Sequence, residues 1–413
     1  MSELLAPDPA VPMRDALLDA PRMAALLGRR LTGTPATGER VNAKYRVGES
    51  LRVVYRLETS AGTRTVAGRT FPGRSAKAFR RAADAAIPLD GMPPVLHLPE
   101  LDAVFWTFPN DRRLQRLGLL AGGPALDRLI GGTDVRTRLV AYAPERAATA
   151  ECLGAGSGVL AYLKLHWDAA ERERAGAEAA FAAIGDSHPR LRVPRVLAAS
   201  AADGALVLEP LPGRRLDGLT QDELGPALRA LGAALATLHH EAPLPARPFD
   251  RIDGSRLAEA VAVIGRARPG CRAAAERLHA RLLERGPDGR AQVVHLHGDA
   301  NLRNALYDGR RIALVDLEDA AAGPAAADLG FVLAGQLAAH VQGDTTAATR
   351  AALGRALLDG YAEVAPPPAK PCLRWHTAAT TLARIAVPAV GRVRPAALAS
   401  LEPLLHVAAE ELT

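Results

Sequence analysis

The sequence is poor in aromatic residues, lysine and cysteine, and it holds no long apolar run. Aromatic residues make up only 4% of the 413 residues, but hydrophobic residues as a whole reach 48% and charged residues 23%. The last two values are close to the averages of globular proteins, so a mainly disordered or fibrous chain is excluded. At about 100 to 200 residues per domain, this length predicts two or three domains.

Three absences bear on where the protein works. No apolar run reaches the roughly 18 residues that a transmembrane helix needs. The first residues, MSELLAPDPAVPMRDALLDA, lack the basic segment and apolar core of a secretory signal. The isolated cysteines Cys152, Cys271 and Cys372 form neither a metal-spaced pair nor a disulfide framework. We therefore expect a cytoplasmic protein without a membrane partner.

The charge is basic but scattered. The net charge is +6 and the pI is near 9.5, yet no block of five or six like charges occurs. We therefore expect no nucleic-acid partner. Only four of the 51 basic residues are lysines, namely Lys44, Lys77, Lys164 and Lys370. In so arginine-rich a chain, a retained lysine can mark a position that needs a compact ammonium group.

Two stretches of the chain share one pattern. Residues 41–114 and 138–216 each predict three strands, a helix and two strands. Offsets between matching residues run from 95 at Arg69/Lys164 to 102 at Leu114/Leu216. This consistency favours an internal duplication, although short hairpins can also resemble one another through composition alone. After residue 213 the pattern becomes helical, with one long helix predicted over 255–286 and a short β segment at 293–316.

The stretch from Val293 to Gly330 carries the clearest chemistry. Asp299 follows His297 and Gly298, Asn304 comes five positions later, and a predicted hairpin leads to Asp316. Phosphoryl transfer needs a carboxylate that orients the attacking hydroxyl, and an amide and a second carboxylate that hold Mg²⁺. Magnesium prefers such hard oxygen ligands. These residues therefore predict a phosphotransferase site.

HGDANLRN followed by ALVDLEDAAAGPAAADLG resembles the catalytic signature of the aminoglycoside phosphotransferase and choline kinase superfamily of small-molecule kinases. The resemblance covers roughly residues 135–413, and LATLHH resembles the helix end that precedes the family's loop. It implies that Asp299 is the catalytic base and that Asn304 and Asp316 are Mg²⁺ ligands. It also implies that Asp328 braces the loop and that His297 is structural.

The resemblance implies an α+β, two-lobed, protein-kinase-like fold with a five-stranded antiparallel N-lobe sheet and a mostly helical C-lobe. Residues 1–125 would hold an N-terminal helical segment and a cap, in which 41–114 resembles a degenerate N-lobe repeat. Residues 126–212 would be the N-lobe and 213–413 the C-lobe. The layout is similar to that of bacterial sugar kinases such as maltokinases, which also carry an N-terminal cap.

Two further acids follow Asp316. Glu318 lies two positions on and would share its strand face, so it is a second-rank metal candidate. Asp319 fits a solvated acidic turn better than a metal ligand.

Lys164 lies inside the apolar strand AYLKLH, where a charge is costly unless it has a partner. In related kinases a strand lysine contacts the α and β phosphates and pairs with a helix glutamate. The following helix offers Glu171, Glu173 and Glu178, and the apolar neighbours of Glu178 make it our choice of partner. An edge-strand lysine that only aids solubility is the alternative.

The remaining nucleotide contacts follow from the same resemblance. The turn Ala143–Ala147 would cover the phosphates, where Arg146 could reach one or simply lie exposed. The EPLP segment, with Glu209 and Leu211, would form the hinge whose backbone bonds the adenine edge. Arg69 stands in the first repeat where Lys164 stands in the second, but no catalytic residues follow it.

The predicted reaction is transfer of the γ-phosphoryl group of ATP or GTP to a hydroxyl of a small molecule, with Mg²⁺. The acceptor would be a sugar or an aminoglycoside-like metabolite. Residues 213–290 hold 13 Arg against 10 Asp plus Glu, so a cleft suited to polycations is not evident, and we favour a neutral or anionic acceptor such as a sugar. A pseudokinase-like nucleotide-binding module without turnover is the alternative.

Overall fold

The computed structural model describes residues 4–156, 158–287 and 291–412. Their contacts divide the chain into two compact units. The first unit comprises Met1–Ala170, Leu197–Leu208 and Val390–Pro395, and the second comprises Glu171–Val196, Glu209–Ala389 and Ala396–Thr413. The boundaries 1–125, 126–212 and 213–413 drawn from the sequence stay a prediction. Among the described residues, no helix is both long enough and apolar enough to cross a membrane.

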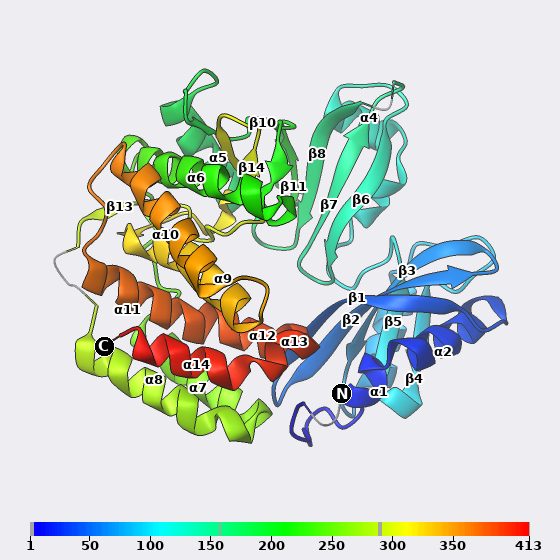
Figure 1. Ribbon diagram of the computed structural model, residues 1–413. Helices are drawn as coiled ribbons and strands as arrows, with labels where there is room; N and C mark the ends of the chain where they lie inside the picture. Colours follow the sequence, from blue (N-terminus) through cyan, green and yellow to red (C-terminus); the bar gives the residue numbers. More distant parts are fainter. Residues whose placement is uncertain (1–3, 157, 288–290, 413) are drawn as a thin grey trace. The chain divides into compact units, whose positions relative to one another are not determined.

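The first unit contains two five-stranded antiparallel sheets (Figure 1). The strands of the first sheet run in the order β1-β2-β3-β5-β4. Their bounds are Thr37–Arg46 (β1), Ser50–Thr59 (β2), Gly62–Thr70 (β3), Val95–Leu98 (β4) and Ala103–Thr107 (β5). Helix α3 (Ser75–Asp84) follows the third strand. Residues 41–114 thus form the strands and helix that the sequence predicts.

The second sheet has the order β6-β7-β8-β11-β10, which repeats the first position by position. Its strands are Arg136–Ala143 (β6), Ala147–Leu153 (β7), Val159–His166 (β8), Val196–Ser200 (β10) and Ala205–Leu208 (β11). Helix α5 (Ala170–Ile184) again follows the third strand in the chain. The five-stranded antiparallel sheet expected ahead of the catalytic segment is therefore present.

The agreement between the two sheets extends to register. The first strand of each has an irregularity, between Arg40 and Asn42 in β1 and between Leu139 and Ala141 in β6. Arg69 lies opposite Arg52 and Val104 on its neighbouring strands, and Lys164 lies opposite Thr149 and Leu206. With Arg69 matched to Lys164, the two bulges lie on the same strand of each sheet but two residues apart, so the shared strand order and the matching places of Arg69 and Lys164 support the duplication.

Short helices complete the first unit. They are α1 (Arg14–Leu18), α2 (Ala20–Thr32) and α4 (Pro124–Ile130). Asp19 caps α2 by accepting from the Arg22 amide, and Gly33 ends it in the left-handed conformation. A 3₁₀ turn, Leu117–Ala121, follows the first sheet.

The second unit is mostly helical. Its helices after α5 are α6 (Gln221–Glu241), α7 (Gly254–Ala267), α8 (Arg272–Arg285), α9 (Ala326–Val341), α10 (Ala347–Ala362), α11 (Lys370–Thr380), α13 (Pro395–Ala399) and α14 (Leu401–Glu410). A π-helical segment, Thr381–Ala386, joins α11 to α12 (Val387–Arg392). The single helix expected over 255–286 is wrong, because Pro269 and Gly270 form a 3₁₀ turn that separates α7 from α8.

Short strands frame the catalytic segment. β13 (Val293–Leu296) pairs with β16 (Ala321–Pro324), and β14 (Ala305–Tyr307) forms a hairpin with β15 (Ile312–Leu314). The hairpin continues into a four-stranded sheet with β12 (Arg214–Arg215) and β9 (Leu191–Arg192). The loop that carries Asp299 therefore begins at the end of β13 and ends at the start of β14, and each of these strands is paired with another strand.

Helices α6 and α10 pack at backbone distance because each has a glycine at the crossing. A Cβ atom on Gly232 would lie 1.9 Å from the carbonyl oxygen of Leu357, and one on Gly360 would lie 1.8 Å from that of Arg229. Both distances are far inside van der Waals contact. The crossing therefore needs glycine on both helices.

We expect Gly232→Ala to destabilise the protein by about 2–3 kcal/mol, because the helices must move apart. Gly225→Ala is the matched control, because Gly225 lies on the same helix and a Cβ atom there would have no neighbour within 4 Å. There the same change should stabilise by up to about 1 kcal/mol through helix propensity. Urea unfolding of both variants measures the difference, and equal effects would contradict the close crossing.

Candidate active site

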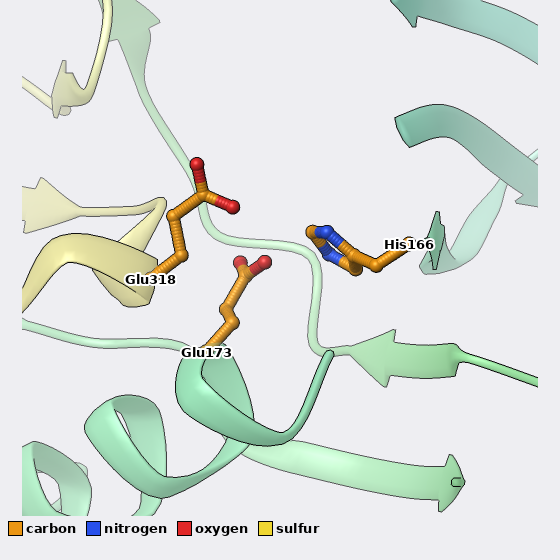
Figure 2. Close-up of side chains that lie close together, drawn as sticks. All are labelled: His166, Glu173 and Glu318. Carbon is orange, nitrogen blue, oxygen red and sulfur yellow. The ribbon is translucent and has the colours of Figure 1, made fainter. Parts of the chain in front are cut away.

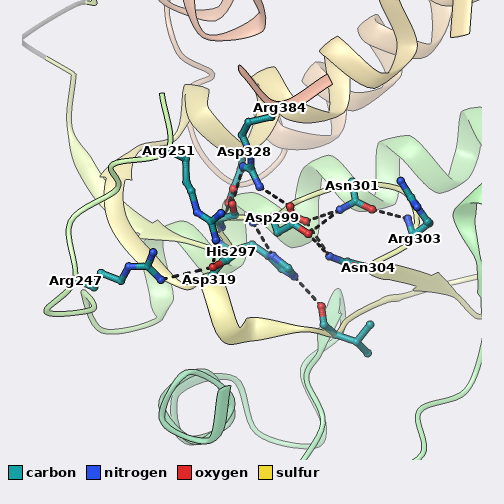
Figure 3. Close-up of polar contacts among 12 residues, drawn as sticks. Arg247, Arg251, His297, Asp299, Asn301, Arg303, Asn304, Asp319, Asp328 and Arg384 are labelled. Carbon is teal, nitrogen blue, oxygen red and sulfur yellow. Dashed lines mark hydrogen bonds and ion pairs between the residues drawn. The ribbon is translucent and has the colours of Figure 1, made fainter. Parts of the chain in front are cut away.

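The loop after β13 is fixed by one buried carboxylate. Asp328, near the start of α9, accepts hydrogen bonds from the backbone amides of His297 at 2.7 Å and Gly298 at 3.0 Å (Figure 3). Its side chain is 2% exposed. Burial opposes its charge, but the hydrogen bond from His239 and the neighbouring histidines and amides lower its pKa overall. Asp328 therefore acts as a charged anchor for the loop backbone.

The last turn of α6 supports this anchor. His239 Nε2 lies 3.2 Å from Asp328 Oδ2, and His239 Nδ1 lies 3.0 Å from the Tyr361 hydroxyl. The hydroxyl, on α10, is also 3.3 Å from His240 Nε2. Because the carboxylate can only accept hydrogen bonds, His239 donates one to it from Nε2. Its Nδ1 then accepts a hydrogen bond from the Tyr361 hydroxyl. The LHH segment thus belongs to the structure that holds the loop.

His297 bonds only to backbone in this network. Its Nε2 donates to the Val315 carbonyl at 3.0 Å, and its Nδ1 accepts from the Asp299 amide at 3.3 Å. The ring therefore ties the catalytic loop to the end of the β14–β15 hairpin. Both ring nitrogens are engaged, as in a positioning residue.

Gly298 allows the loop to pass against the next turn. Its φ is +78°, and a Cβ atom there would lie 1.9 Å from the carbonyl oxygen of Asp319. Both observations exclude a larger residue without displacement of the loop. The glycine of the HGD triplet is thus required by geometry.

Asp299 sits at the centre of the polar contacts. Its Oδ1 bonds Arg384 at 2.5 Å, and its Oδ2 accepts from the side-chain amides of Asn301 at 3.1 Å and Asn304 at 2.9 Å (Figure 3). The side chain is 29% exposed, so the carboxylate is accessible. Burial raises the pKa of Asp299, while the Arg384 charge acts in the opposite direction.

Arg384 was not foreseen from the sequence. It lies in the π-helical segment, donates to the Gly298 carbonyl at 2.8 Å, and stacks over Phe331 at 4.0 Å from the ring centroid. Burial lowers its pKa, and the Asp299 charge opposes that effect. Arg384 is one arginine among 47 and lies 85 positions from Asp299, so no local pattern could single it out.

Asn304 and Asp316 lie at the same end of the β14–β15 hairpin. Asn304 precedes β14, Asp316 follows β15, and the Val315 amide bonds the Asn304 carbonyl at 3.0 Å. The amide nitrogen of Asn304 is engaged by Asp299, so its Oδ1 is the atom that remains to bind a cation. Asp316 adopts a left-handed conformation with φ of 69°. One amide and one carboxylate oxygen donor are a set that suits Mg²⁺.

Glu318 does not lie on a strand. Residues 317–319 form a 3₁₀ turn, so the expectation that Glu318 shares a strand face with Asp316 is wrong. Carboxylate oxygens of Glu318 and of Glu173, on α5, come within 4.8 Å of each other (Figure 2). Gly176 lets α5 approach this turn, because a Cβ atom there would lie 2.6 Å from the Leu317 carbonyl oxygen.

Asp319 is not a solvated turn residue. Its side chain is only 12% exposed and forms ion pairs with Arg251 and, at 3.6 Å, with Arg247 (Figure 3). Two arginines therefore share one carboxylate next to the loop that carries Asp299.

The glutamates of α5 face differently from the prediction. Glu178 is exposed and pairs with Arg174 at 2.5 Å, so its expected inward orientation is wrong. Glu173 is the buried acid of this helix at 1% exposure. It shares its face with Ala177, Ala180 and Ile184, at spacings of four, three and four.

The structure also gives the places of the other residues that were expected to contact the nucleotide. Lys164 is partly buried in β8, and Arg146 is exposed in the turn between β6 and β7. Glu209 pairs with Arg195 at 3.2 Å and Arg192 at 3.6 Å. Its carboxylate is thus occupied, and Leu211 follows it in an irregular segment.

The turn that carries Arg146 also carries Glu145, which the sequence did not single out. Glu145 has a φ of +63° and a side chain only 2% exposed. It pairs with Arg52 at 2.8 Å, Arg69 at 2.5 Å and, closest of all, Arg112. Burial alone would raise its pKa, but the Arg112 hydrogen bond and the three charges lower it. The first sheet thus holds this turn through arginines.

Known structures resemble this chain at low identity. Aminoglycoside phosphotransferase APH(4)-Ia, in a ternary complex with ADP and hygromycin B, superimposes with a TM-score of 0.51 at 14% identity over 70% of this chain and 97% of its own. Its apo form gives 0.52 at 16% identity over 69% and 97%. These two likenesses support the fold. Macrolide 2'-phosphotransferase MphH from Brachybacterium faecium gives 0.44 at 22% identity over 70% and 97%.

No curated protein sequence matches the chain at a significant level. The family model described as the phosphotransferase enzyme family matches residues 154–367, which is more than half of the chain. The match includes the anchored loop, Asp299, Asn304, Asp316 and Asp328. The chain therefore belongs to the phosphotransferase enzyme family of small-molecule kinases.

Proposed function

We propose that the protein transfers the γ-phosphoryl group of ATP or GTP to a hydroxyl of a neutral or anionic small molecule, such as a sugar. The observation that carries the proposal is the anchored loop, in which Asp299 is partly exposed and held by two amides and an arginine. Positioning and electrostatics supply most of the catalysis in phosphoryl transfer. A rigid carboxylate next to two metal-suited donors meets that need.

Asp299 would accept the proton of the attacking hydroxyl. Asn301 and Asn304 fix Oδ2, so the orientation of the carboxylate is set before the acceptor arrives. Arg384 on Oδ1 favours the ionised form against the effect of burial. The carboxylate is therefore both oriented and charged for its role as base.

Asn304 and Asp316 are the proposed Mg²⁺ ligands. Bound Mg²⁺ would neutralise charge on the phosphate oxygens of the nucleotide. The amide oxygen left over by the Asn304–Asp299 bonds supports this assignment. We keep Glu318 as an additional candidate for cation binding, because its carboxylate lies close to that of Glu173.

The nucleotide contacts remain part of the proposal. Lys164 would bind the α and β phosphates, and the helix-glutamate role first given to Glu178 passes to the buried Glu173. Arg146 would lie in the phosphate-covering turn. With the Glu209 carboxylate paired to arginines, the backbone from Glu209 to Leu211 would bind the adenine edge.

The choice of a neutral or anionic acceptor rests on the excess of arginine over acidic residues in residues 213–290. Near Asp299 the charges are mixed, because Arg384 pairs with Asp299, and Arg247 and Arg251 share the carboxylate of Asp319. A screen for ADP formation over sugars, aminoglycosides and amino alcohols tests the proposal. Turnover with a sugar supports it, whereas nucleotide-dependent thermal stabilisation without turnover on any acceptor favours a pseudokinase-like module.

Asp299→Asn should lower kcat by at least about a hundredfold through loss of the proton acceptor, with little change in nucleotide binding. Because burial raises the pKa of Asp299, wild-type kcat/KM should fall on the acidic side at a higher pH than for an ordinary aspartate. Asp359→Asn, at an exposed position of α10, is the matched control. Unchanged turnover in the Asp299 variant would refute the assignment of the base.

Asp316→Ala should remove the Mg²⁺ dependence of ADP affinity, because a site with few protein ligands relies on each carboxylate. Calorimetric titration of ADP with and without Mg²⁺ measures this, with Asp359→Ala, at an exposed position of α10, as control. If wild-type protein binds ADP equally well in both conditions, the metal assignment is wrong.

Lys164→Ala should weaken ATP binding by at least about tenfold, since a charge-assisted hydrogen bond contributes about 1.5–3 kcal/mol. Arg69→Ala should have a smaller effect, because Arg69 pairs with Glu145 and leaves Arg52 and Arg112 in place. Titration of the two variants with ATP compares the matching positions. A larger loss of ATP affinity in the Arg69 variant would show that the first sheet, and not the second, binds the nucleotide.

A further inference from the structure

A cavity of about 650 Å³ lies within the first unit, and none of the residues assigned to catalysis lines it. Helix α3 forms one wall, the segment from Pro109 to Gln115 forms another, and Phe71 and Trp106 also line it. This volume is in the range of small-molecule sites, which span about 300–1,000 Å³.

The wall formed by α3 is cationic. Arg74, Lys77 and Arg81 all line the cavity: Arg74 is the N-cap residue of α3, and Lys77 and Arg81 lie four positions apart on one face of the helix. All three are exposed. Within the described part of the chain, none of the three side chains forms an ion pair or a hydrogen bond. Their charges are therefore available to a ligand.

The one acid in the lining does not offset these charges. Asp111 accepts hydrogen bonds from the amides of Arg113 at 2.7 Å, Leu114 at 2.9 Å and Glu145 at 2.9 Å, and from the Tyr142 hydroxyl at 2.7 Å. Four donors satisfy the capacity of a carboxylate. Asp111 is thus committed to holding the loop and the neighbouring turn.

The aromatic pair offers a surface for a carbon skeleton. The rings of Phe71 and Trp106 lie edge to face with centroids 6.3 Å apart, and small residues of α3 such as Ala78 and Ala82 complete the apolar lining. A cavity with apolar walls and a few convergent charged groups is typical of a small-molecule site. The charges here select for an anion.

We propose that this cavity binds a small phosphate monoester, with the phosphate on Arg74, Lys77 and Arg81 and the carbon skeleton against Phe71 and Trp106. None of the residues assigned to the base, the metal or the nucleotide lines this cavity, and the proposal stands whether or not the proposed reaction is correct. Arg112 lines the same cavity and pairs with Glu145. A bound phosphate can therefore compete with Glu145 for Arg112, and its binding can in this way affect the turn between β6 and β7.

The scarcity of lysine provides a residue-specific test. Lys77 lines the cavity, whereas Lys370 is exposed at the start of α11 in the second unit. Acetylation of the full-length protein with a small acylating reagent, read by peptide mass spectrometry, reports each lysine separately. Phenyl phosphate is the probe, benzyl alcohol is its neutral counterpart, and ADP identifies the nucleotide site through Lys164.

We expect phenyl phosphate at about four times its Kd to slow acetylation of Lys77 about fivefold, since one site in five then stays empty. Lys370 should be unaffected, and benzyl alcohol should protect neither lysine. Protection of Lys77 by ADP alone, equal protection by benzyl alcohol, or no protection by phenyl phosphate at concentrations up to its solubility would each overturn the proposal. Protection by an acidic peptide only would assign the surface to a protein partner instead.

Two variants distinguish a specific phosphate site from non-specific attraction of the anion by positive charge. Arg81→Gln should weaken the protection of Lys77 by phenyl phosphate about tenfold in concentration, through loss of a charge-assisted hydrogen bond. Arg80→Gln changes the neighbouring arginine, which is exposed but does not line the cavity, and should leave the protection unchanged. Circular dichroism verifies that both variants fold. Equal weakening in both would show only a diffuse positive field and refute the site.

Discussion

The bond between Asp328 and the amides of His297 and Gly298 is the constraint on which the active site depends. A buried carboxylate requires several donors to stay ionised, and here two backbone amides and His239 supply them. The backbone that leads into Asp299 is therefore fixed by a charge. The hairpin that carries Asn304 is tied to the same loop through His297 and Val315. The base and the two proposed metal ligands thus share one support.

Arginine supplies the positive charge in the ion pairs described above, in accord with a composition that has few lysines. A guanidinium group has donors in several directions and can serve two acceptors at once. Arg384 does so by bonding both the Gly298 carbonyl and the Asp299 carboxylate. Its place in a π-helical segment is consistent with the tendency of such irregular turns to occur at functional sites.

Local patterns were sufficient for much of the fold and for the loop. Alternation predicted the strands of residues 41–114, and the spacing from His297 to Asp316 predicted a loop and hairpin that the structure contains. The buried face of α5 was predicted wrongly because alanines occur on every side of that helix. Apolar neighbours in the sequence therefore could not distinguish Glu173 from Glu178. Glu318 was misplaced because a left-handed residue at Asp316 ends the strand alternation.

The three arginines around Glu145 create an unequal tolerance to mutation. Loss of Arg52, Arg69 or Arg112 leaves two cations on the carboxylate. Loss of Glu145 would leave three guanidinium groups close together with no counter-charge, and this cost cannot be shared. A change in any one of the three arginines should therefore cost less stability than loss of the glutamate, which all three contact.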